Sequence, residues 1–174
     1  MAVDTETREE LATALYEAHE QAEPVDRLTE TWDVGTEDAY DIQTRFVDRR
    51  LEDGATVVGH KVGLTSDGIQ AQLGVDEPDF GRLLDTMLVD GPIPSENLIE
   101  PRVEPEIGFI MDEPLDPPVT PLDVLTATRS VVPVLEIIDS RIRDWDIQIQ
   151  DTIADNASSA LYVTGEATRP VSGL

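Results

Sequence analysis

Apolar residues recur at helical spacing near the start of the chain. Within residues 5–21 they fall at Leu11, Ala14, Leu15 and Ala18, three or four positions apart, which is the spacing of one helix face. The pattern predicts an amphipathic helix that packs one side against a core.

A second amphipathic segment begins at the start signal Thr36-Glu37-Asp38 and ends at Gly54. Its apolar positions are again three to five residues apart, and a glycine commonly follows the last turn of a helix. We therefore predict that residues 1–54 form an N-terminal helical region. The apolar face comprises Ala39, Ile42, Phe46 and Leu51.

Beyond Gly54 the pattern changes to short apolar runs separated by turn residues. Residues 55–66 predict a strand, Ser66 can cap a short helix through Leu73, and residues 74–84 suggest a loop around Asp79. Further short apolar runs, a capped helix at 120–128 and a closing helical turn and strand follow. Helices followed by short strands predict an α+β fold with a mixed or antiparallel β core over residues 55–174. The runs are 83–89, 103–111 and 131–139, and the closing segment is 151–165.

Composition adds an unusual charge balance. The 174 residues carry 37 acidic and 12 basic side chains, a formal charge of −25 that is spread along the chain. Distributed acid with one lysine suits multimolar salt, where charges are screened within about 3 Å, so we predict a halophilic cytoplasmic protein; an ordinary acidic protein is the alternative. With no basic stripe, the chain is not expected to bind nucleic acid, and its charged N-terminus predicts no membrane span.

Two glutamates in the run 103–111 stand two positions apart. In a strand, residues i and i+2 share a face, so Glu104 and Glu106 would point the same way beside an apolar stretch. Like charges on one face are unfavourable unless a proton or a cation lies between them. The alternative is a pair of solvated glutamates on an edge strand.

Glu136 interrupts the most apolar run of the chain. A lone buried carboxylate must be paired, protonated or metal-bound, and Arg141 and Arg143 offer a structural salt bridge as the alternative. Together with Glu104 and Glu106, it forms an all-oxygen set that suits Mg²⁺ or Mn²⁺. Because the chain has no cysteine and only two histidines, a zinc site is not expected.

Two further features offer polar chemistry. Lys61 is the only lysine, and lysine is a compact cation whose pKa falls readily on desolvation; survival by chance at the surface is the alternative. The segment 151–160 is dense in short polar side chains, which usually cap turns. Those side chains also offer Asp155 and Ser158 as candidate substrate-binding residues.

Five blocks, in this order, resemble the 2-keto-4-pentenoate hydratase family of the fumarylacetoacetate-hydrolase superfamily, which includes the related 4-oxalocrotonate decarboxylases. The resemblance covers essentially the whole chain, and it implies a mixed β-roll with an N-terminal helical region, assembled as a homo-oligomer. The blocks are GHKVGLTS, LGVDEPDFG, PRVEPEIGF, LEIIDSRIRDW and DTIADNASSALYVTG.

The resemblance also implies site residues and a substrate. The metal-binding carboxylates fall on Glu104, Glu106 and Glu136, which would hold Mg²⁺ or Mn²⁺. The active-site lysine falls on Lys61, the acid of DEPDFG on Asp79, and the hydroxyl of DNASS on Ser158. The small-molecule substrate is a 2-hydroxy-2,4-dienoate, a 2-keto acid precursor from catechol meta-cleavage.

Members of that family continue for roughly half this length again after the strand of the last block. We therefore expect a C-terminally truncated chain, in which residues 55–174 hold the N-terminal part of the β-roll. Three functions stay open: a hydratase, a 4-oxalocrotonate-type decarboxylase, or a non-catalytic homologue that binds metal or a full-length partner. Water addition without CO₂ release marks the first of these.

Overall fold

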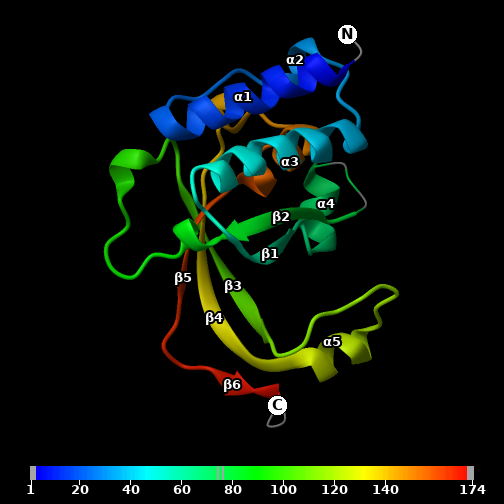
Figure 1. The fold of residues 1–174 in the computed structure, drawn as a ribbon, viewed down its shortest axis with the longest axis vertical. Coiled ribbons are helices and arrows are strands. Elements are labelled where there is room, and N and C mark those ends of the chain that lie inside the picture. Colours follow the sequence, from blue (N-terminus) through cyan, green and yellow to red (C-terminus); the bar gives the residue numbers. More distant parts are fainter. Residues whose placement is uncertain (1–2, 74, 76, 172–174) are drawn as a thin grey trace.

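The computed structural model describes residues 3–73, 75 and 77–171. Its N-terminal part is helical, with α1 (Thr5–Gln21), α2 (Leu28–Thr31) and α3 (Thr36–Glu52) (Figure 1). The Asp4 carboxylate accepts a hydrogen bond from the Thr7 amide at 2.9 Å and caps α1. Both long predicted helices are confirmed, and the short α2 was not expected.

The hydrophobic core lies where α1 and α3 pack together and against residues from the second half of the chain. Leu15 and Ala12 of α1 and Ile42 and Phe46 of α3 are almost fully buried. The same cluster includes side chains from positions 84, 87, 142, 153 and 154. The helical region thus shares one core with later elements, and a boundary at residue 54 stays a prediction.

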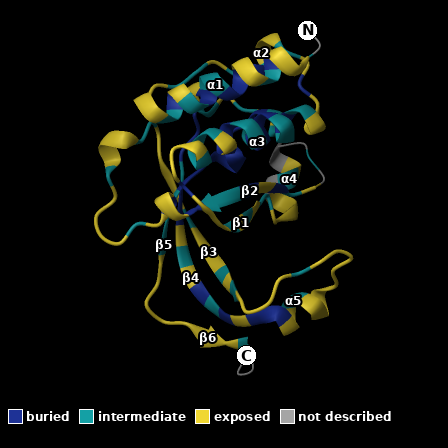
Figure 2. Ribbon diagram, in the orientation of Figure 1, coloured by how far each residue is buried: buried dark blue, intermediate teal, exposed yellow. Residues whose placement is uncertain are grey.

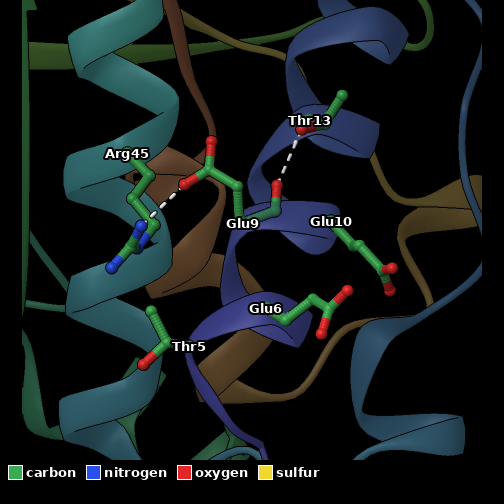
Figure 3. A pocket seen from close by; sticks show the side chains of 6 residues that line it. All are labelled: Thr5, Glu6, Glu9, Glu10, Thr13 and Arg45. Carbon is green, nitrogen blue, oxygen red and sulfur yellow. Dashed lines mark hydrogen bonds and ion pairs between the residues drawn. The ribbon is translucent and has the colours of Figure 1, made fainter.

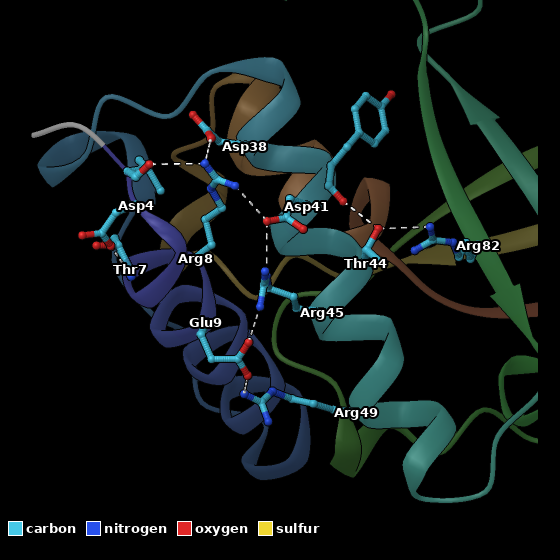
Figure 4. Close-up of polar contacts among 12 residues, drawn as sticks. Asp4, Thr7, Arg8, Glu9, Asp38, Asp41, Thr44, Arg45, Arg49 and Arg82 are labelled. Atoms are coloured by element: carbon cyan, nitrogen blue, oxygen red, sulfur yellow. Dashed lines mark hydrogen bonds and ion pairs between the residues drawn. The ribbon is translucent and has the colours of Figure 1, made fainter.

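Ion pairs join the exposed edges of α1 and α3 (Figure 4). Glu9 accepts from Arg45 at 2.6 Å and also pairs with Arg49, while Arg8 reaches Asp38 at 3.0 Å. Each pair is partly exposed, so each adds little stability by itself. Arginines of α3 therefore contact α1 as well as solvent.

The first sheet contains two antiparallel strands, β1 (Val57–Gly63) and β2 (Asp79–Leu84), with α4 (Asp67–Leu73) between them. The strand and short helix expected here are confirmed. The loop expected around Asp79 is wrong from that residue onward, because residues 79–84 pair with β1. The run 83–89 is only partly strand, since η1 (Asp85–Met87) turns the chain directly after β2.

The second sheet is also antiparallel. Its order is β3 (Arg102–Met111), β4 (Thr128–Ile138), β5 (Ser159–Thr164), with β6 (Arg169–Pro170) paired to β4. The predicted capped helix is α5 (Pro121–Ala127), whose cap is Thr120. Two 3-10 turns, η2 (Ser95–Asn97) and η3 (Arg143–Trp145), lie before β3 and after β4. The expected α+β class is confirmed, with antiparallel pairing between the described strands.

The return from β4 to β5 passes through α6 (Ile149–Ala154) and the turn η4 (Asn156–Ser158). Both are largely buried under α3, whereas β3 is mostly exposed and β4 carries buried, intermediate and exposed residues along its length (Figure 2). Among the described residues, no helix is long and apolar enough to cross a membrane. The arrangement brings the start of β5, the end of β4 and the first sheet close together.

Candidate functional site

Three glutamates meet on the second sheet. Glu104 of β3 lies directly opposite Glu136 of β4 in the register, and Glu106 follows two positions along β3. One carboxylate oxygen from each residue lies within 4.8 Å of the other two. Antiparallel pairing therefore adds the third carboxylate to the two that share a strand face.

This cluster is electrostatically strained in the absence of a cation. The pKa of Glu106 is raised, first by burial and then by the negative charges of Glu136 and Glu104. Like charges this close disfavour full ionisation unless a positive charge intervenes. An all-oxygen donor set on a rigid strand pair fits a hard divalent cation such as Mg²⁺.

Lys61 supplies one positive charge to the cluster. Its ammonium lies 2.9 Å from Oε1 of Glu136, and their side chains are only 11% and 7% exposed. It also donates a hydrogen bond of 2.9 Å to the carbonyl of Ala157. The alternative pairing of Glu136 with an arginine is wrong: Arg141 pairs with Asp155, and Arg143 pairs with Asp26.

A left-handed turn holds the acceptor of Lys61 in place. Asn156, Ala157 and Ser158 all have φ between 51° and 54°, a conformation in which asparagine is several-fold enriched. The Asn156 side chain accepts from the amide of Arg82 at 2.7 Å and donates to its carbonyl at 2.9 Å. The turn thereby extends the edge of β2 and points the Ala157 carbonyl at Lys61.

Asp79 lies in the same region, at the start of β2. Its side chain is 2% exposed, and Oδ1 is buried without a hydrogen-bond partner among the described residues. It faces Gly63 across the strand pair, where an added Cβ would come within 2.2 Å of that oxygen. Burial raises the pKa of Asp79, and the charge of Lys61 opposes that rise. The result is a carboxyl group that takes up a proton easily.

The two candidates from segment 151–160 have different surroundings. The Ser158 hydroxyl is buried and has no partner within the described part of the chain, so it is free to bind a ligand group. Asp155 is fully buried and bonds to the Arg141 side chain and amide, and burial raises its pKa to about 6. Its carboxylate is thus bonded to Arg141, which gives Asp155 a structural role, and substrate binding by Asp155 stays a prediction.

A separate surface hollow of about 540 Å³ lies along α1, away from the glutamate cluster (Figure 3). Acidic side chains line it, and Arg45 closes one side through its ion pair with Glu9. This hollow holds none of the predicted site residues, and its lining is that of a solvated helix surface.

Three contributors to the site have roles that were not predicted from the sequence, although two of them are polar residues of the segment 151–160. They are Asn156, the carbonyl of Ala157, and Ser159, whose hydroxyl donates to Glu136 Oε1 at 2.9 Å. Asparagine followed by small residues is a signal for left-handed turns, which could have indicated the first. A backbone carbonyl carries no signal in the sequence. Together these residues complete a compact polar site with hard oxygen donors, one ammonium and one protonatable acid.

This arrangement defines a candidate enzyme site for a small anionic molecule. Comparison with known proteins indicates the family of enzymes to which such a site belongs. The chain is 50% identical over 163 residues to a 2-hydroxypent-2,4-dienoate hydratase of Pseudomonas putida, covering 90% of this chain and 73% of that protein. It is 48% identical over 171 residues to a 2-keto-4-pentenoate hydratase of Paraburkholderia xenovorans, covering 96% and 64%. No family model matches the sequence.

A solved structure agrees with the sequence relatives. The 4-oxalocrotonate decarboxylase of Pseudomonas putida G7, complexed with magnesium and adipate, superimposes with a TM-score of 0.93 at 32% identity, covering 99% of this chain and 67% of that one. The chain therefore belongs to the family of 2-keto-4-pentenoate hydratases and 4-oxalocrotonate decarboxylases, and the predicted resemblance is confirmed. It spans between about three fifths and three quarters of the length of these relatives.

Proposed function

We propose that the chain acts in the hydration of 2-hydroxypenta-2,4-dienoate to 4-hydroxy-2-oxopentanoate, a step of aromatic meta-cleavage catabolism. The observation that carries the proposal is the ion pair between Lys61 and Glu136 at the centre of the three-glutamate cluster. Relatives named as hydratases, at 50% and 48% identity, support the choice of reaction.

A divalent cation fits the residues present. Glu104, Glu106 and Glu136 would hold it, because their oxygens converge within 4.8 Å, and burial together with the neighbouring carboxylates raises the pKa of Glu106. Mg²⁺ is supported by the magnesium complex of the solved relative, and Mn²⁺ has the same preference for oxygen ligands. When bound, such an ion supplies Lewis-acid stabilisation to the oxygen of an enolate.

The chain's own residues supply charge and proton transfer. Conversion of the dienol to the 2-oxo-3-enoate removes the proton from the 2-hydroxyl oxygen and adds one at C5. Addition of water then places its oxygen on C4 and a proton on C3. Asp79 is assigned the general acid and base role, because its Oδ1 is buried without a hydrogen-bond partner among the described residues and burial raises the pKa of the carboxyl group.

Lys61 and Ser158 are assigned to the substrate's charged end. Lys61 places a fixed ammonium beside the glutamates, where it can neutralise a carboxylate or an enol oxygen. The unpartnered Ser158 hydroxyl can donate a hydrogen bond to the same group. Because the two residues are joined through the turn that contains Ala157, substrate binding and the lysine position are coupled.

The test follows the ultraviolet absorbance of the dienoate with Mg²⁺ or Mn²⁺ present. The expected result is metal-dependent loss of absorbance, formation of the 4-hydroxy-2-oxo acid, and a fall in turnover of orders of magnitude in Lys61→Ala with metal binding retained. Near-normal turnover in Lys61→Ala would refute the role of the lysine. Retained metal binding with no turnover in the unsubstituted chain would favour a non-catalytic homologue.

A decarboxylase activity is the second candidate, and the solved relative at a TM-score of 0.93 favours considering it. The Lys61 ammonium would stabilise the enolate oxygen that develops when CO₂ departs. Release of CO₂ from a 2-oxo dicarboxylate substrate distinguishes this reaction from water addition.

We propose that the two antiparallel sheets form part of a β-roll, that the protein assembles as a homo-oligomer, and that it works in a salt-rich cytoplasm. The formal charge of −25 supports the last point, because distributed carboxylates remain well hydrated in concentrated salt. Light scattering across a range of KCl concentrations tests assembly and salt dependence together.

A further inference from the structure

We propose that Ser159 is a positioning residue for the cation site. Its hydroxyl fixes Glu136 so that one carboxylate oxygen stays bound to the protein and the other stays available to a cation. The inference rests on the proposed function, because it takes the three glutamates as the cation ligands.

The Ser159 hydroxyl and the Lys61 ammonium both contact the same carboxylate oxygen of Glu136. Oε1 accepts the Ser159 hydroxyl at 2.9 Å and pairs with the Lys61 ammonium at 2.9 Å. A carboxylate oxygen has two lone-pair sites, so these two donors fill Oε1. Within the described part of the chain, Oε2 receives no hydrogen bond, and it is the oxygen left for a cation.

The position of Ser159 allows it to keep Oε1 of Glu136 bound while Oε2 stays available. It begins β5, lies opposite Ile138 in the register, and is buried. Its carbonyl accepts a hydrogen bond of 3.1 Å from the Arg141 side chain, which in turn pairs with the fully buried Asp155. On the other side, the carbonyl of Ser158 accepts a hydrogen bond of 2.8 Å from the Asp139 amide. The backbone is thus anchored both before and after the hydroxyl, and the hydroxyl position is set before a ligand arrives.

The role of Ser159 differs from that of Lys61 at the same oxygen. Lysine brings a full charge on a long flexible side chain, which can follow the carboxylate to more than one orientation. The serine hydroxyl is short, and it reaches Oε1 in one orientation. Removing the hydroxyl therefore frees the Glu136 carboxylate to rotate while the ion pair is retained.

Groups that orient a metal ligand through a hydrogen bond typically change metal affinity about 10- to 100-fold when removed. We expect Ser159→Ala to weaken Mn²⁺ binding about tenfold, because Lys61 still restrains the same oxygen. Ser159→Cys, which keeps a weaker donor in a similar volume, should fall between the wild type and Ser159→Ala.

The experiment measures Mn²⁺ affinity of the purified chain by electron paramagnetic resonance and by calorimetry, without substrate. The matched control is Ser130→Ala, a buried serine on β4 that lies opposite Ile110, six positions from Glu136. Ser130→Ala should bind Mn²⁺ within twofold of the wild type. Urea unfolding of each variant separates loss of folding from loss of affinity.

The Mn²⁺ affinities of the wild type and the two alanine variants distinguish the positioning role of Ser159 from the cation site itself. Ser159→Ala binding within twofold of the wild type overturns the positioning role, while wild-type binding still supports the cation site. An equal loss in Ser130→Ala also overturns it, because the effect would then be general packing. If the wild type binds no Mn²⁺, the cation site of the proposed function fails, and this inference fails with it.

Discussion

The buried pair between Lys61 and Glu136 makes a quantitative prediction about stability. At a separation of 2.9 Å, two unit charges attract by about 6 kcal/mol with an effective dielectric constant of about 20. Desolvation offsets part of this attraction, and breaking such a pair by removing one partner costs about 3–5 kcal/mol. Lys61→Met should therefore lower the free energy of unfolding by about 3–5 kcal/mol, a large fraction of the about 5–15 kcal/mol by which a domain is typically stable.

The assay is urea unfolding in EDTA at neutral pH, because urea is uncharged and leaves the ion pair unscreened. Arg129→Met is the matched control: its pair with Asp112 spans 3.4 Å, and both side chains are more than half exposed, so its loss should be under about 1 kcal/mol. Adding Mg²⁺ should stabilise Lys61→Met more than the wild type, because the cation replaces the missing positive charge beside Glu136.

Two results would refute this reasoning. A loss below about 1 kcal/mol for Lys61→Met in EDTA would mean that Glu136 is solvated rather than buried with its partner. Equal stabilisation of variant and wild type by Mg²⁺ would mean that the cation binds away from Lys61. The slope of unfolding free energy against urea should be the same in both proteins, which confirms that the comparison concerns one folded state.

Three further predictions address the surroundings of the site. Gly63→Ala should reduce turnover about 100-fold in steady-state kinetics, because the new Cβ would lie 2.2 Å from Asp79 Oδ1 and displace that carboxyl; unchanged turnover would remove Asp79 from the chemistry. Asp155→Asn should cost more than about 3 kcal/mol in urea unfolding, since it leaves Arg141 buried without its counter-charge, whereas a raised KM with unchanged stability would support the predicted substrate-binding role instead. The raised pKa of Asp79 means that the folded state holds a proton which the unfolded state releases above about pH 3.8, so stability falls as pH rises through the raised pKa. The stability of Asp79→Asn relative to the wild type, measured by urea unfolding, should therefore be greater at pH 7 than at pH 4. An equal difference in stability at both pH values would contradict the shift.

The helices and most strands could be predicted because their signals are local. The spacing of Leu11, Leu15 and the Ala39–Phe46 face fixes two amphipathic helices without any knowledge of their partners. The start of β2 could not be predicted in the same way, since Asp79 follows turn-forming residues and is drawn into a strand only by pairing with Gly63. Tertiary pairing overrode a loop-like sequence at that position.

In the candidate site, too, the residues with a local signal could be predicted and their tertiary pairing could not. Glu104, Glu106, Glu136 and Lys61 were all identifiable, because a charge in an apolar run, or a lone lysine, is conspicuous in the sequence itself. What the sequence could not reveal is the pairing, because Arg141 stands closer to Glu136 along the chain than Lys61 does. In the structure Arg141 pairs with Asp155, and Lys61 of β1 pairs with Glu136 of β4. These pairs are set by the packing of separate elements in the folded chain rather than by proximity in sequence.

That choice of partners has a chemical consequence. A guanidinium on Glu136 could occupy both carboxylate oxygens at once through its planar fork, and no oxygen would then remain for a cation. A single ammonium and a single hydroxyl both contact Oε1, so the carboxylate is restrained and still available as a ligand. The lone lysine at position 61 therefore does what none of the eleven arginines could do in its place: it balances the charge of a buried glutamate without saturating it.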